Sequence, residues 1–170
     1  MKYAFDTSVL VLLLDSDAQV PGNPETGKPV ERVKERIDYM MEGIEREKHK
    51  IIVPTPVLGE ILEKATAQTA QAYCERIQKD KSFEIVPFDI LAAIEVAELH
   101  RTAWKTESVG PDVSRQKVKV DKQILAICKV HEVKICYTDD QNMQRLGEQI
   151  GIQTQGIAEL PLPRSPKLGL

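Results

Sequence analysis

Residues 1–15, MKYAFDTSVLVLLLD, place a carboxylate between two apolar runs. Lys2–Phe5 has the brevity and the aromatic content of a strand, and a second apolar run starts at Val9. Asp6 therefore lies where a buried strand ends and a helix begins. An isolated charge in such a place is costly unless something compensates it. This stretch predicts a strand–helix unit whose junction acid either caps the helix or serves a site.

Similar short runs recur along the chain and alternate with helical patterns. They predict strands at Lys2–Phe5, Lys50–Val53, Phe83–Val86, Lys134–Tyr137 and Ile152–Thr154. The segments between them predict helices at Val30–Lys48, Pro56–Ala67, Thr69–Lys79, Ile90–Trp104, Lys119–His131 and Asn142–Gly147. Strands that alternate with helices indicate an α/β fold with a mostly parallel sheet of four to five strands. Ligands of such sheets gather at the carboxyl ends of the strands.

The composition is that of one globular domain without a membrane anchor. The chain has 170 residues, 42% of them apolar, and a net charge of −3, which argues against wholesale coating of nucleic acid but allows a local basic patch. The apolar run Val9–Leu14 is too short to span a bilayer. We expect residues 1–160 to form the domain, residues 161–170 to form a Pro-rich tail, and the protein to be cytoplasmic.

Further carboxylates occupy positions like that of Asp6. Glu60 lies at the edge of the apolar stripe of its helix, and Asp121 shares the register of the apolar residues that follow it. Asp139 and Asp140 directly follow a strand. Each position also has an ordinary explanation. These are a helix cap for Asp121, a solvated edge residue for Glu60 and a polar turn for the aspartate pair.

The joint placement of these acids is more informative than any one of them. If they converge at one sheet edge, they repel one another and their pKa values rise. A hard divalent cation relieves the repulsion, and a site built from oxygen ligands favours Mg²⁺ or Mn²⁺. Zinc is disfavoured because His49, His100 and His131 lack metal-ligand spacing and the cysteines form no pair.

The chain resembles the PIN-domain nuclease family, especially the VapC-type toxins of prokaryotic toxin–antitoxin systems. The resemblance rests on YAFDTSVL at 3–10, PVLGEIL at 56–62 and VDKQILAICKVHEVKICYTDDQN at 120–142, and it extends over most of the chain. It implies a three-layer α/β/α fold and an acidic site with one or two Mg²⁺ or Mn²⁺ ions. The implied reaction is metal-dependent endonucleolytic hydrolysis of RNA phosphodiester bonds.

The family's site residues can be placed on this chain. The resemblance implies that Asp6, Glu60, Asp121 and Asp140 are the catalytic acids. The implied metal ligands are Asp6, Asp121 and Asp140, with Asp139 as the substitute for Asp140. Ser8 and Thr138 are expected to supply hydroxyls that support these acids. A small antitoxin protein and a homodimer are the implied protein partners.

RNA must approach this acidic site past cationic side chains. The region 100–122 is the richest in them, and we expect Arg115, Lys117, Lys119 and Lys122 to contact phosphates. The alternative is an ordinary solvated surface. Trp104, the only tryptophan, is either a base-stacking platform or, more commonly, a core residue.

Two other functions are compatible with acids at strand ends. A Mg²⁺-dependent phosphatase of the haloacid-dehalogenase type needs Asp-x-Asp after the first strand, but the chain has Asp6-Thr7-Ser8 there. A PIN-like scaffold could bind RNA or a partner without cutting. Because all the expected acids are present, the sequence favours the nuclease.

Overall fold

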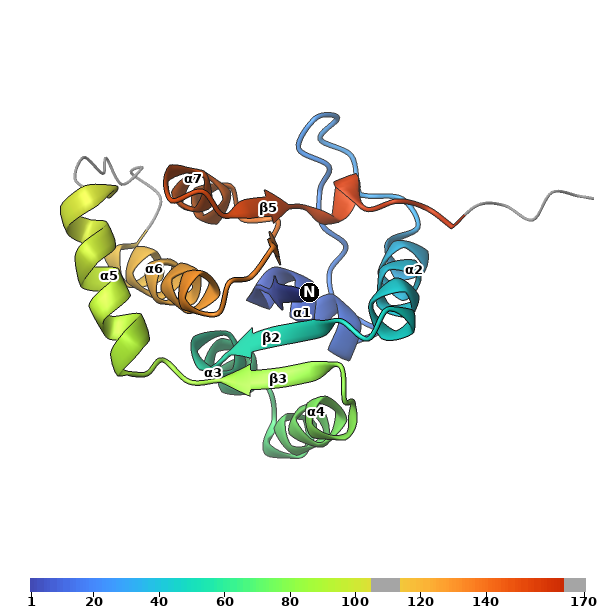
Figure 1. Cartoon of the computed structure of the whole chain (residues 1–170). Coiled ribbons are helices and arrows are strands. Elements are labelled where there is room, and N and C mark those ends of the chain that lie inside the picture. The colour runs from blue at the N-terminus through green and yellow to red at the C-terminus, as the bar shows by residue number, and fades with distance from the viewer. Residues whose placement is uncertain (105–113, 164–170) are drawn as a thin grey trace, which may run out of the picture.

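The computed structural model describes residues 1–104 and 114–163. Its centre is a five-stranded sheet in the order β3-β2-β1-β4-β5, and every neighbouring pair is parallel (Figure 1). The strands are β1 (Lys2–Phe5), β2 (Lys50–Pro54), β3 (Phe83–Val86), β4 (Ile135–Tyr137) and β5 (Gln153–Gln155). The predicted α/β class and parallel sheet are confirmed.

Helices lie on both sides of the sheet and give the three-layer arrangement (Figure 1). They are α1 (Thr7–Leu14), α2 (Val33–Arg46), α3 (Thr55–Lys64), α4 (Ala67–Lys79), α5 (Ile90–Thr102), α6 (Arg115–Val130) and α7 (Gln141–Gln149), followed by the 3₁₀ turn η1 (Ile157–Glu159). The predicted helices occur within a few residues of these bounds. The largest difference in the second half of the chain is α6, which begins at Arg115 because the Ser114 side chain caps it.

The central strands are apolar on both faces, as expected for a parallel sheet covered by helices on either side. Phe5 of β1 and Ile51 and Ile52 of β2 have no solvent exposure. Trp104 is also buried, and its indole N–H donates to the carbonyl of Leu146 at 3.3 Å. Trp104 is therefore a core residue, which is the commoner of its two predicted roles.

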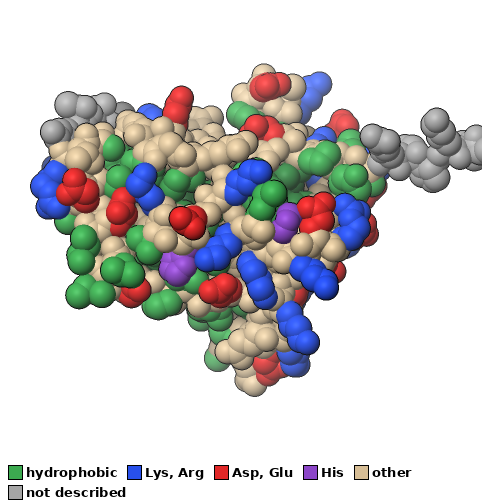
Figure 2. Space-filling view, in the orientation of Figure 1, with side chains coloured by type: hydrophobic (Ala, Val, Ile, Leu, Met, Phe, Trp, Pro, Cys, Tyr) green, Lys and Arg blue, Asp and Glu red, His purple; other side chains and the backbone are tan. Residues whose placement is uncertain are grey.

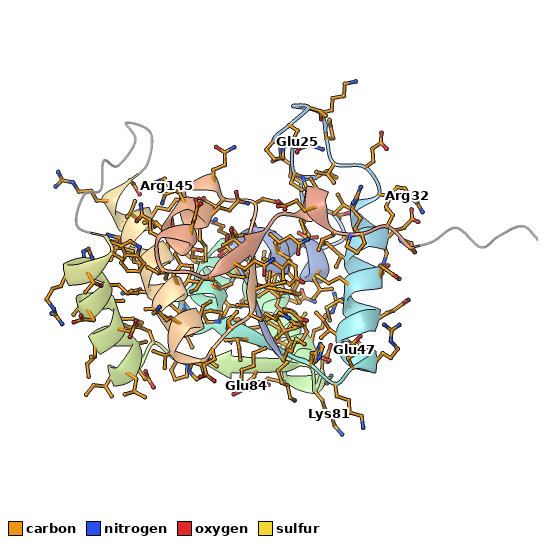
Figure 3. The ribbon with its side chains drawn as sticks, turned by 45° about the horizontal axis from the view of Figure 1, so that its top comes forward. Glu25, Arg32, Glu47, Lys81, Glu84 and Arg145 are labelled. Carbon is orange, nitrogen blue, oxygen red and sulfur yellow. The ribbon has the colours of Figure 1, made fainter. Side chains whose placement is uncertain are left out.

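The outer surface is mostly polar. Charged side chains such as Glu25, Lys81 and Arg145 project outward (Figure 3). An exception is α5, over which hydrophobic side chains gather (Figure 2), with Ile90, Leu91 and Ile94 more than half exposed. Within residues 1–104 and 114–163, no helix has the length and hydropathy that crossing a bilayer requires.

The C-terminal segment is attached to the domain through α2. The Arg36 guanidinium donates to the carbonyls of Ala158 and Leu160, and Leu160 is buried. Residues 164–170 of the predicted tail lie outside the described residues, and the domain boundary at residue 160 stays a prediction.

Candidate active site

The carboxyl ends of β1 and β4 open into one pocket of about 400 Å³. Asp6 follows β1 and caps α1, whereas Asp140 follows β4 and caps α7. Glu60 of α3 and Lys117 of α6 line the same pocket. Asp121 of α6 joins it by binding the Lys117 ammonium. We call Asp6, Glu60, Asp121 and Asp140 the acid pocket.

Asp6 is buried and held by hydrogen bonds to both carboxylate oxygens. One oxygen accepts from the Thr7 N–H at 2.6 Å, which is the helix cap. The other accepts from the Thr138 hydroxyl at 2.8 Å and the Ser8 hydroxyl at 3.3 Å. Burial raises the pKa of Asp6, although the bonds from Thr138 and Thr7 oppose it. The two predicted roles of Asp6 are therefore compatible, because the capping carboxylate also faces the pocket.

The hydroxyls of Thr138 and Ser8 connect the ends of β1 and β4. Besides donating to Asp6, Thr138 Oγ1 accepts from the Asp140 N–H at 3.0 Å. Ser8 Oγ in turn accepts from the Asp139 N–H at 3.2 Å. Fully buried Thr138 thus fixes the position of two acids of the pocket at once.

Asp121 lies inside α6, which rules out the predicted helix cap. Its side chain is almost fully buried and accepts hydrogen bonds from Lys117 Nζ at 3.2 and 3.4 Å and from Asn142 Nδ2 at 3.1 Å. Burial raises the pKa of Asp121 to about 6, even though Lys117 and Asn142 both lower it. A carboxylate whose pKa is raised this far by burial is typical of a functional site.

Lys117 links Asp121 to Asp140. Its ammonium lies 2.7 Å from Asp140 Oδ2, and its four-residue spacing from Asp121 places both on one face of α6. Burial opposes the charge on Lys117, but the bonds and charges of Asp140 and Asp121 prevail and raise its pKa. Burial likewise opposes ionisation of Asp140, yet the bond from Lys117 holds the pKa of Asp140 below its usual value. The sequence assigns Lys117 to RNA, whereas its ammonium lies among the acids.

The two remaining acids are placed differently. Glu60 lines the pocket and accepts a hydrogen bond from the Thr7 hydroxyl. Asp139 turns toward η1, where one carboxylate oxygen accepts from the Ile157 N–H at 2.8 Å. Its other oxygen is buried and has no partner among the described residues. Of the aspartate pair, the structure brings Asp140 to the acid pocket.

The other predicted RNA contacts lie on a different face of α6. Arg115, Lys119 and Lys122 line a pocket of about 630 Å³ between α5 and α6, together with His100 and apolar side chains that include Phe88. Arg115 and Lys119 are exposed. Lys122 is buried, with its ammonium 5.2 Å from the Trp104 ring centroid and 3.5 Å from the His100 ring. Residues 105–113 of the cationic region lie outside the described residues.

The donors of the acid pocket suit a hard cation in their chemistry. They are carboxylate and hydroxyl oxygens, which Mg²⁺ and Mn²⁺ prefer, and a cationic ammonium already lies between Asp121 and Asp140. Across residues 1–104 and 114–163, however, no three Asp, Glu, His or Cys side chains are spaced as a ready-made metal site. The residues thus fit a divalent ion by their chemical type and charge but not by their present spacing. Binding the ion would require the carboxylates to move closer together.

Comparisons with known proteins support this fold. The sequence matches the family model of the PIN domain over residues 3–149. No curated protein sequence matches it. A chain of VapBC2 from Rickettsia felis, bound to a DNA fragment from its promoter, is 14% identical with a TM-score of 0.61, and the match covers 92% of this chain and 98% of that one.

Two further solved structures are similar. A chain of VapBC-1 from nontypeable Haemophilus influenzae is 12% identical with a TM-score of 0.59, over 94% of this chain and 100% of that one. A chain of a toxin–antitoxin complex from Klebsiella pneumoniae is 13% identical with a TM-score of 0.50, over 84% and 89%. At these identities the likeness establishes the fold.

Proposed function

The chain belongs to the PIN domain family, and from this we propose that it is a Mg²⁺- or Mn²⁺-dependent endoribonuclease. The observation that carries the proposal is the acid pocket. Its members come from four separate parts of the chain, around β1, α3, α6 and β4, and the Lys117 ammonium binds two of them, Asp121 and Asp140. Buried carboxylates destabilise the fold, so their convergence favours a site over a structural role.

Each residue of the pocket has a proposed task. Asp6, Asp121 and Asp140 would hold the divalent ion, and Glu60 lines the same pocket. Ser8 and Thr138 fix the orientation of Asp6 through their hydroxyls. We leave Asp139 out of the metal set because its carboxylate binds the backbone of η1. A bound Mg²⁺ or Mn²⁺ would supply the Lewis acid for hydrolysis of a phosphodiester.

RNA would reach the pocket across the start of α6. The exposed Arg115 and Lys119 lie within one turn of Lys117, which lines the acid pocket. Because they line the neighbouring pocket between α5 and α6, these cations would bind phosphates of the same strand further from the bond to be cut. Lys122 would contribute to the positive potential rather than through direct contact, because it is buried beside Trp104.

We also propose an antitoxin protein and a second copy of this chain as partners. The antitoxin is supported by the similarity to chains of two VapBC assemblies and of a further toxin–antitoxin complex. The homodimer is supported by the exposed apolar side chains Ile90, Leu91 and Ile94 on α5, because such patches favour association. The cytoplasmic location stays a prediction.

A cleavage assay tests the enzymatic function. Metal-stripped protein is incubated with end-labelled single-stranded RNA in chelator, Mg²⁺ or Mn²⁺. We expect cleavage only with a divalent ion, and a loss of about a hundredfold or more in Asp6→Asn. Asparagine also caps helices, so the fold should persist, which circular dichroism checks. The matched control is Asp38→Asn, which removes an exposed carboxylate paired with Lys34 on α2.

The outcomes separate the nuclease from its alternatives. RNA that is bound but never cut would support the non-catalytic scaffold. Hydrolysis of p-nitrophenyl phosphate without RNA cleavage would support a phosphatase. Cleavage by Asp6→Asn at the wild-type rate would contradict the assignment of the acid pocket.

A further inference from the structure

We propose that the Lys117 ammonium is a built-in counter-ion of the acid pocket, which a divalent ion must displace in order to bind. Lys117 would then set the metal affinity of the site. This inference rests on the proposed metal dependence and adds a regulating residue to it.

The geometry is that of a cation coordinated by several acids. Lys117 Nζ lies 2.7 Å from Asp140 Oδ2 and 3.2 and 3.4 Å from the two oxygens of Asp121. Its positive charge also acts on buried Asp6. One ammonium therefore binds two of the four acids and stabilises the negative charge of a third. A divalent ion held by the same acids would need the same oxygen lone pairs, so the two cations compete.

Local structure fixes the start of the Lys117 side chain and leaves its end movable. Ser114 caps α6 by accepting from the Lys117 N–H at 3.1 Å, which anchors the first turn. The Lys117 side chain is 44% exposed, whereas that of Asp121 is 4% exposed. The ammonium can therefore leave toward solvent by changing rotamers, and the carboxylates it leaves can then draw together around a divalent ion.

The charge balance explains why such a residue is present. Without a cation, the acid pocket would hold several carboxylates in a partly buried space, which destabilises the fold. Lys117 offsets part of this cost in the metal-free protein. A divalent ion offers twice the charge and more coordination, so it can replace the ammonium. Removing the ammonium should lower the stability of the metal-free protein and strengthen metal binding.

Mn²⁺ binding without RNA tests the proposal. Free Mn²⁺ is measured by electron paramagnetic resonance during titration of the wild type, Lys117→Met and Lys119→Met. Each substitution removes one positive charge from an exposed lysine of α6, but Lys119 lines the pocket between α5 and α6 and Lys117 lines the acid pocket. We expect the Kd for Mn²⁺ to fall by about tenfold or more in Lys117→Met, because charge-assisted bonds are lost only there. In Lys119→Met the Kd should change less than about twofold.

Thermal unfolding provides a second measurement. Metal-free Lys117→Met should melt below the wild type, and saturating Mn²⁺ should raise its Tm by more than it raises that of the wild type. If Lys117→Met does not fold, Lys117→Gln removes the charge and keeps a polar donor. Lys117→Arg, which keeps a cation, should bind Mn²⁺ nearly as the wild type does.

The outcomes distinguish this inference from the proposed function. If Lys117→Met binds Mn²⁺ with the same affinity as the wild type, and the wild type cuts RNA, the inference is overturned and the proposed nuclease function stands. Equal tightening in Lys117→Met and Lys119→Met would also overturn it, because a general charge effect would then suffice. A wild type that neither binds Mn²⁺ nor cuts RNA would overturn the proposed function, and the inference with it.

Discussion

Replacing Asp121 with asparagine should stabilise the metal-free protein at neutral pH. Burial raises the pKa of Asp121 to about 6 in the folded state, whereas an aspartate in an unfolded chain titrates near about 3.9. The folded state therefore binds this proton more tightly. The stability from this protonation is fully present below pH about 4 and is lost as the pH rises through about 6.

The pKa difference sets the size of the effect. A shift of about two pKa units corresponds to about 3 kcal/mol at most, because each unit is worth about 1.4 kcal/mol. Solvent at the mouth of the pocket and adjustment of Lys117 reduce this to about 1–2 kcal/mol. Asparagine has nearly the same shape and carries no charge. Asp121→Asn should thus raise the free energy of unfolding by about 1–2 kcal/mol at pH 7.5 and by less than about half as much at pH 4.5.

Urea denaturation in the presence of a chelator measures this difference. The wild type, Asp121→Asn and the exposed control Asp38→Asn are unfolded at both pH values. The control loses only a surface ion pair with Lys34, so it should change by less than about 1 kcal/mol at pH 7.5. If Asp121→Asn is less stable than the wild type at pH 7.5, the ionised carboxylate stabilises the fold and our account of the pocket is wrong.

Three other predictions test the packing around the site. Thr138→Val removes the 2.8 Å hydrogen bond to buried Asp6 and should cost about 1–3 kcal/mol in urea unfolding, whereas an unchanged midpoint would show that this bond is unimportant. Gly147→Ala places a methyl 3.0 Å from a neighbouring side chain and should lower Tm, whereas Gly59→Ala meets open space in α3 and should raise it. Tm shifts of the same sign in the two variants would contradict this contrast. Trp104 should fluoresce at short wavelength and resist iodide quenching in the native state, and quenching as strong as in urea would show that it is exposed.

Much of the fold follows from local patterns. Short Val-, Ile-, Tyr- and Phe-rich runs between helices predict the parallel strands, because parallel connections need crossovers. The strand order depends on where each crossover returns, and no single segment of the sequence encodes that. The start of α6 was predicted at Lys119 and lies at Arg115, because a lone serine cap before a polar turn is a weak signal.

The acids of the acid pocket could be predicted from the sequence, but their exact arrangement could not. Strand ends and helix faces identify the acids, but not how the chain turns after β4. That turn gives Asp140 to the pocket and Asp139 to η1. The place of Lys117 was missed, although its four-residue spacing from Asp121 indicated an ion pair on one helix face. A lysine in the first turn of a helix near acids can bind a substrate phosphate or pair with the acids. Only the three-dimensional arrangement distinguishes these two roles.

The central position of β1 has a consequence for protein synthesis. β1 leaves the ribosome well before β4, which is one of its two neighbours, and Asp6 bonds Thr138, which lies 132 residues later. A nascent chain that ends before α6 carries only Asp6 and Glu60 of the four acids and has no second neighbour for β1. The unfinished polypeptide therefore has no complete site while it is held among ribosomal RNA, and the four acids can meet only after Asp140 has been synthesised.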